Sequence, residues 1–187
     1  MLNIVGLCGS LRTASYNRML MRLAESVMPA SMKLAVAEWR DVPMFDADVL
    51  ANGFPPPVAA VRDLVRKADG ILIVTPEYNF SIPGGLKNVI DWLSRGEDQP
   101  FAGKPVAILT ASPGPVGGAR VQYDLRKVML FVNAMTLIKP EVFVGNAASK
   151  FNADGECTDE TTRKFVTAQM TAFEPWIAAV KRMAAPA

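Results

Sequence analysis

Residues 70–92 read GILIVTPEYNFSIPGGLKNVIDW, and this stretch decides the fold. The apolar run Ile71–Thr75 is rich in β-branched residues, which predicts a buried strand. The segment Pro83–Ser94 predicts a helix, since a helix tolerates proline at its start. The residues between them form a polar and aromatic tip. A strand that ends in such a tip before a helix is typical of the ligand crevice of an open α/β sheet, although the prolines and glycines also fit a plain surface turn.

The alternation of strand and helix continues on both sides of this stretch. Apolar runs predict further strands at Leu2–Cys8, Met32–Ala37, Lys104–Thr110 and Thr136–Val144. Helical spacing of apolar residues predicts further helices at Asn17–Met28, Val58–Ala68, Ala119–Asn133 and Thr158–Met183. Strands that alternate with helices form a parallel sheet with right-handed crossovers. We therefore expect an α/β fold, a three-layer sandwich around a five-stranded parallel sheet, in one domain spanning residues 1–187.

Local signals add detail to these ranges. Lys139-Pro140 should distort the last strand, Thr158 is a candidate N-cap for the last helix, and Pro175 is expected to bend that helix. Residues 41–57 are rich in proline and acids, and they predict a long, irregular connection between the second strand and the following helix.

The composition narrows the function. The chain has 187 residues and a net charge of +2 from interspersed signs, which argues against a nucleic-acid binder with its concentrated basic face. The absence of histidine excludes serine–histidine hydrolase chemistry and a histidine-ligated zinc site. Cys8 and Cys157 make no disulfide framework, and neither a signal peptide nor a membrane span is recognisable, so a reduced, cytoplasmic protein is expected. If the chain is an enzyme, a bound cofactor should carry the reaction.

A candidate phosphate site follows the first predicted strand. Backbone N–H groups at the start of the next helix favour an anion, and Arg12 can neutralise its charge. Short polar side chains add hydrogen-bonding groups, those of Ser10, Ser15 and Asn17. The loop has neither the spaced glycines of a dinucleotide fingerprint nor the Gly-Lys-Ser/Thr of a P-loop. Ordinary helix capping by Ser15 or Thr13 is the simpler alternative, but a cap alone would not need this whole set of side chains.

Two more loops should meet at the same edge of the sheet, because parallel strands end at a common edge. In the tip quoted above, Tyr78 and Phe80 could flank a planar ring, while Asn79 and the backbone meet its polar edge. Glu77 is a possible general base, but a helix cap or an ion pair is the favoured interpretation. The glycine- and proline-rich loop Ala111–Gly118 permits close backbone approach to a ligand. The three loops together predict a site for a flat heterocycle with one phosphate.

Three motifs resemble those of the NADPH-dependent FMN reductase family, and the similarity spans nearly the whole chain. It is greatest to the family's bacterial NAD(P)H:quinone reductases, which also reduce chromate and azo compounds. The motifs are Gly9-Ser10-Leu11-Arg12…Ser15…Asn17, Pro76-Glu77-Tyr78-Asn79…Ser81…Pro83-Gly84…Leu86-Lys87-Asn88…Asp91-Trp92, and Gly117-Gly118-Ala119-Arg120.

The resemblance implies a flavodoxin-like fold with noncovalent FMN, NAD(P)H as co-substrate, and homodimers or homotetramers that hold the flavin near a subunit interface. The FMN phosphate and ribityl end would be held by Ser10, Leu11, Arg12, Ser15, Tyr16 and Asn17. The isoalloxazine ring would be lined by Pro76, Glu77, Tyr78, Asn79 and Phe80, and its other polar edge by Ser112 and Gly117. Pro113 and Pro115 make this third loop stiffer than the Ser/Gly-rich loops of the family.

The implied reaction is a two-electron, ping-pong transfer from NAD(P)H to a quinone or a similar acceptor, in which FMN carries the chemistry and no side chain acts as acid or base. A non-enzymatic flavodoxin-type electron carrier is one alternative, although such carriers are typically acidic. A reductase of diffusible FMN and a regulatory or structural α/β domain without ligand are the others. In an oligomer we expect Arg120, Tyr123 and Glu141 near subunit contacts. The sequence does not distinguish NADH from NADPH, or a dimer from a tetramer.

Overall fold

The structure is a computed structural model that describes residues 1–184. The strands in this part of the chain are β1 (Leu2–Cys8), β2 (Met32–Val36), β3 (Gly70–Thr75), β4 (Pro105–Ala111), β5 (Met135–Thr136) and β6 (Val142–Val144). The helices are α1 (Tyr16–Ser26), α2 (Ala47–Leu50), α3 (Pro56–Lys67), α4 (Gly84–Leu93), α5 (Ala119–Phe131) and α6 (Glu160–Ala184), with a short 3-10 turn at Ala147–Ser149.

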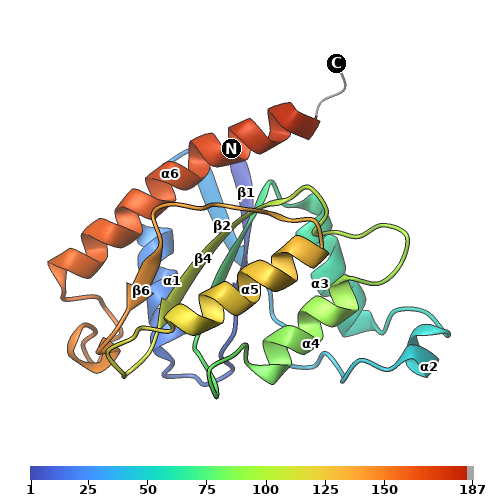
Figure 1. The fold of residues 1–187 in the computed structure, drawn as a ribbon, viewed down its shortest axis with the longest axis horizontal. Helices are drawn as coiled ribbons and strands as arrows, with labels where there is room; N and C mark the ends of the chain where they lie inside the picture. The colour runs from blue at the N-terminus through green and yellow to red at the C-terminus, as the bar shows by residue number, and fades with distance from the viewer. Residues whose placement is uncertain (185–187) are drawn as a thin grey trace.

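A parallel sheet forms the centre of the molecule, with the strand order β2-β1-β3-β4-β5 (Figure 1). β1 pairs with both β2 and β3, so that Leu7 lies opposite Ile73, and β3 pairs in turn with β4. The inner strands are continuous apolar runs because helices cover both faces of the sheet. The order of the strands reverses between β1 and β3, which is where open α/β sheets form a ligand crevice. The predicted three-layer α/β architecture is confirmed.

Alternate residues of each strand pack against opposite layers of helices. In β3, Leu72 and Val74 belong to the hydrophobic cluster formed with α1 and α6. Ile71 and Ile73 belong to the cluster formed with α3, α4 and α5. On this second side α4 and α5 lie next to each other, as Figure 1 shows. Within residues 1–184, no helix is long and apolar enough to cross a membrane.

The last predicted strand is wrong in its extent. The segment Thr136–Val144 pairs with β4 only at its two ends, as β5 and β6, and the cis Lys139-Pro140 bond lies in the break between them. Proline has no N–H to donate to a strand ladder, so the pairing stops near it. Within the described residues β5 and β6 therefore share the position beside β4 where one strand is expected, so that the sheet keeps five positions and counts six strands.

Two buried glutamines from opposite layers bridge this break. Gln122 Nε2 of α5 donates to Val142 O (2.8 Å). Gln169 Nε2 of α6 donates to Pro140 O (2.8 Å) and to Ile108 O of β4 (3.2 Å). These side chains satisfy carbonyl groups that a continuous ladder would have paired, and they keep the interrupted edge attached to the sheet.

The N-cap of α6 also differs from the prediction, because Asp159 takes the place assigned to Thr158. The Asp159 carboxylate accepts from the hydroxyl (2.5 Å) and the backbone N–H (2.8 Å) of Thr162. These two hydrogen bonds hold the pKa of Asp159 below its usual value. α6 continues through Pro175 as one helix.

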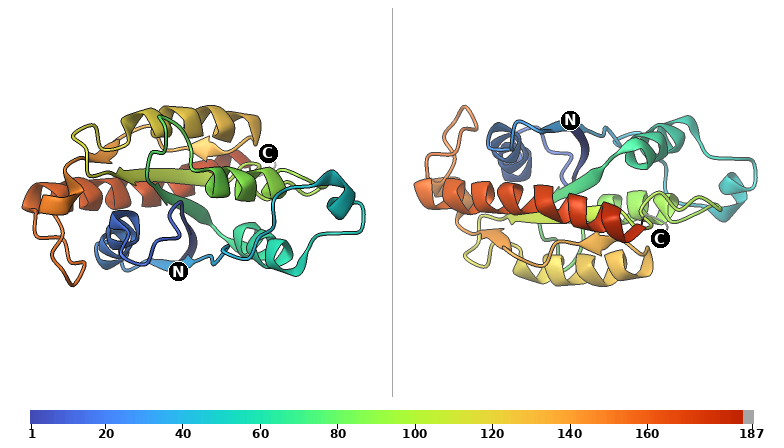
Figure 2. Two further views of the ribbon diagram at one scale, coloured as in Figure 1. Left: turned by 90° about the horizontal axis from the view of Figure 1, so that it is seen from below. Right: turned by 90° about the horizontal axis from the view of Figure 1, so that it is seen from above.

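Residues 41–57 form an arm that is not wholly irregular, because Asp46 caps the short helix α2 within it. In Figure 2, α2 lies at the far end of the arm, away from the sheet. Two side chains of α4 fix the base of the arm: Asn88 Nδ2 and Trp92 Nε1 both donate to Pro43 O (2.8 Å each).

A buried arginine ties α3 to the loop that follows α4. Arg62 is 2% exposed, and its guanidinium donates to Arg95 O (2.7 Å), Asp98 O (3.1 Å) and the Asp98 carboxylate (2.7 Å). The ring of Phe54 packs against the guanidinium at 3.9 Å. The buried charge of the Arg62 guanidinium is tolerated because its N–H groups donate to carbonyl oxygens and to a carboxylate.

Replacing Arg62 with methionine should lower the free energy of unfolding by about 3 kcal/mol, because carbonyl and carboxylate groups would lose a buried cationic donor. Arg66→Met is the matched control, since Arg66 also binds Asp98 but is half exposed, and its loss should be much smaller. Urea unfolding followed by circular dichroism measures both variants. Equal losses would contradict the role given to the buried guanidinium.

Candidate functional site

Three loops converge at the carboxyl edge of the sheet, as the sequence predicts. They follow β1, β3 and β4 and span residues 9–15, 76–83 and 112–118. The first loop packs against the end of β3, because Gly9 lies so close to Thr75 that a Cβ on the glycine would overlap the threonine side chain. The topology therefore brings these candidate loops together at the point where the strand order reverses.

The first loop presents hydrogen-bonding groups and an exposed cation. α1 begins at Tyr16, and Ser15 is its N-cap, with the Ser15 hydroxyl accepting from Asn17 N (3.2 Å). Ser10 and Ser15 are buried. Arg12 is exposed, and its guanidinium lies 5.8 Å from the centre of the Tyr16 ring. Hydroxyls, backbone N–H groups and a guanidinium at a helix start are the groups that bind a phosphate monoester.

Asn17 is already paired within the protein. Its buried amide meets the backbone of Ala111 at the end of β4: Nδ2 donates to Ala111 O and Oδ1 accepts from Ala111 N, both at 3.0 Å. These two bonds join the helix after the first loop to the strand before the third. The geometry gives Asn17 a positioning role between the two loops, and its contact with a ligand stays a prediction.

Two side chains outside the predicted site fix the first loop through hydrogen bonds to backbone carbonyl groups. Trp39 Nε1 donates to Cys8 O (2.9 Å), and an amino group of Arg40 donates to Leu11 O (2.7 Å). Both come from the segment directly after β2, and they fix one peptide plane at the start of the loop and one within it. Neither residue lies in a recognisable motif, and their only signal is an aromatic and a basic residue at the end of a predicted strand.

The tip of the second loop is a two-residue hairpin. Tyr78 N donates to Ser81 O (3.0 Å), and Ser81 N donates to Tyr78 O (2.9 Å). Asn79 and Phe80 stand between them with φ of 50° and 67°. Two-residue hairpins of this kind need positive φ at both central residues. The turn leaves Tyr78, Asn79 and Phe80 exposed. Pro76, which precedes the turn and is also predicted to line the ring, is half-buried.

Glu77 joins this tip to α5. Its carboxylate accepts from the backbone N–H groups of Arg120 (3.1 Å) and Val121 (3.2 Å) and from Arg120 Nε (2.6 Å). The N-cap of α5 is Gly118, which has no side chain to offer, so Glu77 caps the helix from a distant part of the sequence. The Glu77 side chain is only 7% exposed. The cap and ion-pair interpretation of Glu77 is confirmed.

Further contacts fix the same tip. Ser81 Oγ donates to the carboxylate of Asp124 (2.8 Å), and hydrogen bonds from Lys127 and Ser81 lower the pKa of Asp124. The Arg120 guanidinium lies over the ring of Phe80, 3.9 Å from its centre. The aromatic tip is therefore held against the first turns of α5 rather than left as a free loop.

The third loop is braced by the segment that ends β6. Ser112 N donates to Val144 O (3.0 Å), and the Ser112 hydroxyl donates to Gly114 O (3.1 Å). Gly117 has a φ of 66°, and a Cβ on it would lie 2.8 Å from Gly145 N. Glycine is required at 117 both by this backbone conformation and by the close approach of the two chain segments.

Neither cysteine is placed as a nucleophile. Cys8 ends β1 in the interior, and burial raises the pKa of its thiol. Cys157 is also free and buried. Buried thiols of this kind are inert, because the thiolate is the reactive form.

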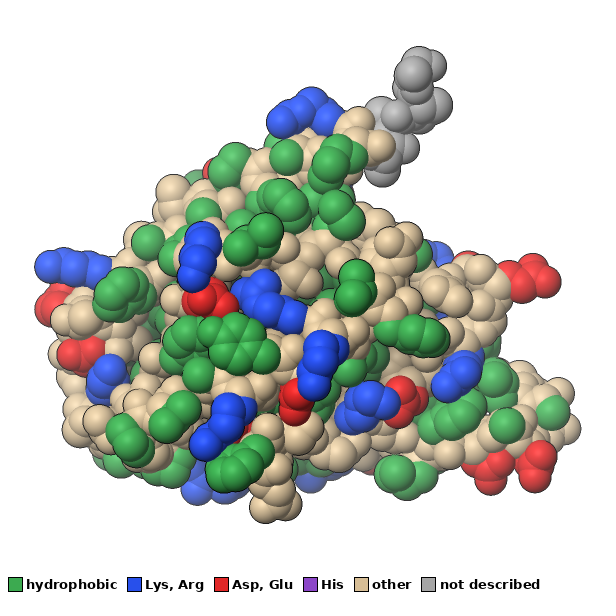
Figure 3. Space-filling model, viewed as in Figure 1, with side chains coloured by type: hydrophobic (Ala, Val, Ile, Leu, Met, Phe, Trp, Pro, Cys, Tyr) green, Lys and Arg blue, Asp and Glu red, His purple; other side chains and the backbone are tan. Residues whose placement is uncertain are grey.

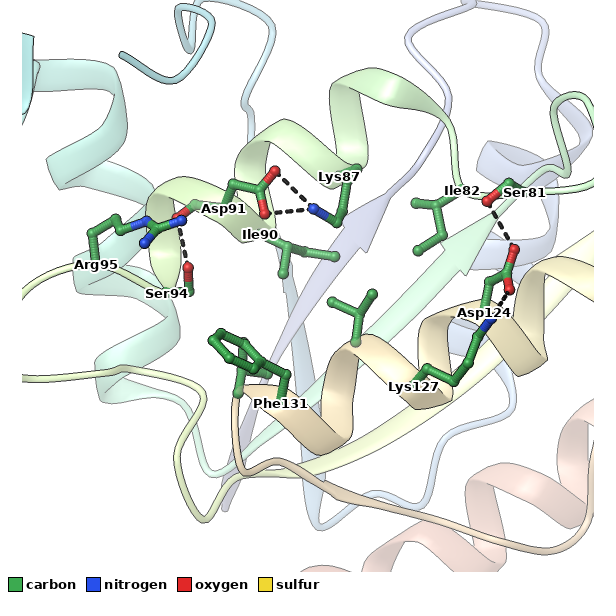
Figure 4. Close-up of a pocket in the computed structure, with 12 residues that line it drawn as sticks. Ser81, Ile82, Lys87, Ile90, Asp91, Ser94, Arg95, Asp124, Lys127 and Phe131 are labelled. Atoms are coloured by element: carbon green, nitrogen blue, oxygen red, sulfur yellow. Dashed lines mark hydrogen bonds and ion pairs between the residues drawn. The ribbon is translucent and has the colours of Figure 1, made fainter. Parts of the chain in front are cut away.

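A cavity of about 670 Å³ lies between α4 and α5, next to the end of the second loop (Figure 4). Two ion pairs line it, Lys87 Nζ with Asp91 (2.6 Å) and Lys127 Nζ with Asp124 (2.6 Å). Apolar side chains of both helices line the rest, and Ser81 connects the cavity to the aromatic tip. The sequence did not predict this cavity, because it depends on how two helices pack.

Comparisons with known proteins agree on one family. A family model described as NADPH-dependent FMN reductase matches residues 2–149. The quinone reductase of Escherichia coli is 50% identical over 183 residues, which cover 96% of this chain and 97% of that protein. An NAD(P)H-dependent FMN reductase of Pseudomonas aeruginosa is 43% identical, over 94% of this chain and 95% of that protein.

A solved structure extends the agreement to three dimensions. The flavoenzyme NAD(P)H:(acceptor) oxidoreductase from Paracoccus denitrificans matches with a TM-score of 0.88 at 34% identity, covering 96% of this chain and 98% of that one. The sequence and the architecture thus point the same way. The chain belongs to the NADPH-dependent FMN reductase family.

Proposed function

We propose that this protein is an FMN-dependent oxidoreductase that uses NAD(P)H to reduce quinones, with chromate, azo compounds and other small molecules as further acceptors. The quinone and FMN reductases named above support the assignment. The observation that carries it is the convergence of a phosphate-type loop, an aromatic tip and a glycine-rich loop at one edge of the sheet. A flat heterocycle with one phosphate is a ligand that these three loops together suit.

The residues present fit FMN. The donors at the start of α1 match a phosphate monoester, since hydroxyls, a guanidinium and helix N–H groups meet there. The exposed aromatic tip offers surface to a planar ring, and the third loop offers backbone at close range. We assign to the phosphate and ribityl end Ser10, Leu11, Arg12, Ser15, Tyr16 and Asn17, the last of which also positions the loop. We assign to the ring Pro76, Glu77, Tyr78, Asn79, Phe80, Ser112 and Gly117.

FMN, when bound, supplies the hydride and two-electron chemistry. The protein binds and orients it, and no side chain is needed to move a proton. Glu77 is the acid nearest to the aromatic tip in the sequence, and its carboxylate is committed to α5 and Arg120. A ping-pong order follows if the nucleotide and the acceptor use the same open side of the site in turn.

Anaerobic stopped-flow mixing of the FMN-loaded protein with NADH or NADPH tests this proposal. We expect the nucleotide alone to bleach the flavin absorbance, and a quinone to restore it. A flavodoxin-type carrier would stay yellow without a partner reductase, and a reductase of diffusible FMN would lose its flavin on gel filtration. Protein that purifies colourless and binds no added FMN would overturn the assignment.

Arg12→Ala should weaken FMN binding, because the phosphate would lose a charge-assisted hydrogen bond. The loss should raise the dissociation constant about 10- to 100-fold. Arg22→Ala, on the exposed side of α1 beyond the loop, is the matched control and should leave binding unchanged. Fluorescence titration of FMN into apoprotein measures both constants. Equal affinities of the two variants would remove Arg12 from the phosphate site.

Glu77→Gln should leave the rate of flavin reduction close to that of the wild type, because glutamine keeps the shape of the cap and no proton passes through this residue. A general acid or base typically contributes about 10²–10⁴-fold to a rate. A loss of that size, in protein that still retains FMN, would show that Glu77 takes part in the chemistry. Single-turnover reduction by NADH separates the two outcomes.

We further propose that the protein is a homodimer or homotetramer with the face of α4 and α5 at a subunit interface. Leu130 and Phe131 are each 80% exposed, and Figure 3 shows hydrophobic side chains among charges of both signs on this side of the molecule. Positive and negative side chains both line the cavity between these helices, as two Lys–Asp ion pairs. A second copy of the same face is therefore electrostatically complementary to it. We assign subunit contacts to Arg120, Tyr123 and Glu141 as well.

Replacing Phe131 with aspartate should convert the oligomer to a smaller species, because a buried, unpaired carboxylate opposes association. Leu64→Asp is the control, since Leu64 is also exposed but belongs to α3. Sedimentation velocity at micromolar concentration measures both variants. A wild-type protein that is monomeric at this concentration would refute the proposed interface.

We also propose a cytoplasmic location. The two cysteines are free and buried, as is usual for proteins of a reducing compartment.

A further inference from the structure

Phe80 adopts a backbone conformation that suits glycine. It is the second central residue of the hairpin between Tyr78 and Ser81, and its φ is 67°. Asn79, the first central residue, is of a type that tolerates positive φ, and glycine at the second position would do so freely. A bulky aromatic residue at positive φ is strained. Turn formation alone therefore does not explain why phenylalanine stands here.

Burial does not offset this strain, because Phe80 is 67% exposed. Its neighbours orient the ring without covering it. The Arg120 guanidinium lies over the ring, 3.9 Å from its centre, and Arg120 is itself held by Glu77 through a 2.6 Å ion pair. One face of the ring is thus backed by a fixed cation, and much of its remaining surface is open to solvent.

The exposure of the Phe80 ring leaves it free to contact a molecule from solvent. It stands at the outer end of the tip after β3, and it is more exposed than Tyr78, the other aromatic residue of the tip, at 51%. Phe80 is also assigned to the lining of the flavin ring, and its exposed surface is the part of the side chain that an exchanging substrate can reach from solvent. An exposed aromatic ring on a loop of the proposed flavin site is suited to a planar partner that comes and goes.

We propose that Phe80 is a specificity-determining residue whose open face stacks on flat, conjugated electron acceptors, with Arg120 as the positioning residue behind it. The acceptor class is that of fused-ring quinones such as naphthoquinones. Acceptors without a planar ring gain nothing from the contact. The inference rests on the proposed reductase function, since it assigns one residue to the choice of acceptor in that reaction.

The test compares an aromatic acceptor with a non-aromatic one across three variants. For each protein, kcat/KM is measured with menadione, a naphthoquinone, and with ferricyanide, which has no ring to stack. Phe80→Gly and Phe80→Leu should lower the ratio of the two values about two- to tenfold, the size of one aromatic stacking contact. Phe80→Tyr keeps the ring and should keep the ratio.

Folding of the variants is checked separately. Phe80→Gly should melt at or above the wild-type temperature, because glycine relieves the positive φ. A lower melting temperature would show that the side chain is structural and would overturn the inference. A change of sedimentation coefficient in Phe80→Gly would assign the ring to a subunit contact, which also overturns it.

Failure of this inference can be told apart from failure of the proposed function. If the wild type is reduced by NAD(P)H and reoxidised by menadione, but Phe80→Gly and Phe80→Leu keep the wild-type ratio with FMN bound, the role of Phe80 is wrong and the reductase assignment stands. If the wild type binds no FMN, or is not reduced by NAD(P)H, both are wrong.

Discussion

Parallel pairing makes β1, β3 and β4 end at the same edge of the sheet, so that the loops after them meet there. The phosphate-type loop, the aromatic tip and the glycine-rich loop are far apart in the sequence, and only this pairing brings them together. Helices on both faces bury the strands, which is why their sequences are continuous apolar runs. The same burial that stabilises the fold thus also places the candidate cofactor site.

Polar contacts between the loops then set their relative positions. Asn17 links the first loop's helix to the end of β4, and Glu77 links the second loop to the start of α5. Glu77 illustrates how one contact serves fold and site together. α5 begins after a glycine and lacks a cap of its own, so the acid that satisfies its first N–H groups also holds the aromatic tip in place.

Strand and helix positions were largely predictable, because hydrophobic runs and helical spacing report local burial. The edge after α5 was the exception. The apolar run Thr136–Val144 predicts a single strand, yet the segment pairs only at its ends, and side chains of Gln122 and Gln169 bond to carbonyl groups in and beside the break. Pairing at a sheet edge depends on partners distant in sequence, which periodicity does not report.

By itself, the sequence determined the three-layer class, the loops that carry the site and the residue types in them, since motif and spacing are local properties. The tertiary structure decided what each side chain does. It committed Glu77 and Asn17 to partners more than forty residues away, showed Trp39 and Arg40 behind the phosphate loop, and left Phe80 exposed at positive φ. Those roles arise from contacts between distant segments, and such contacts exist only once the chain has folded.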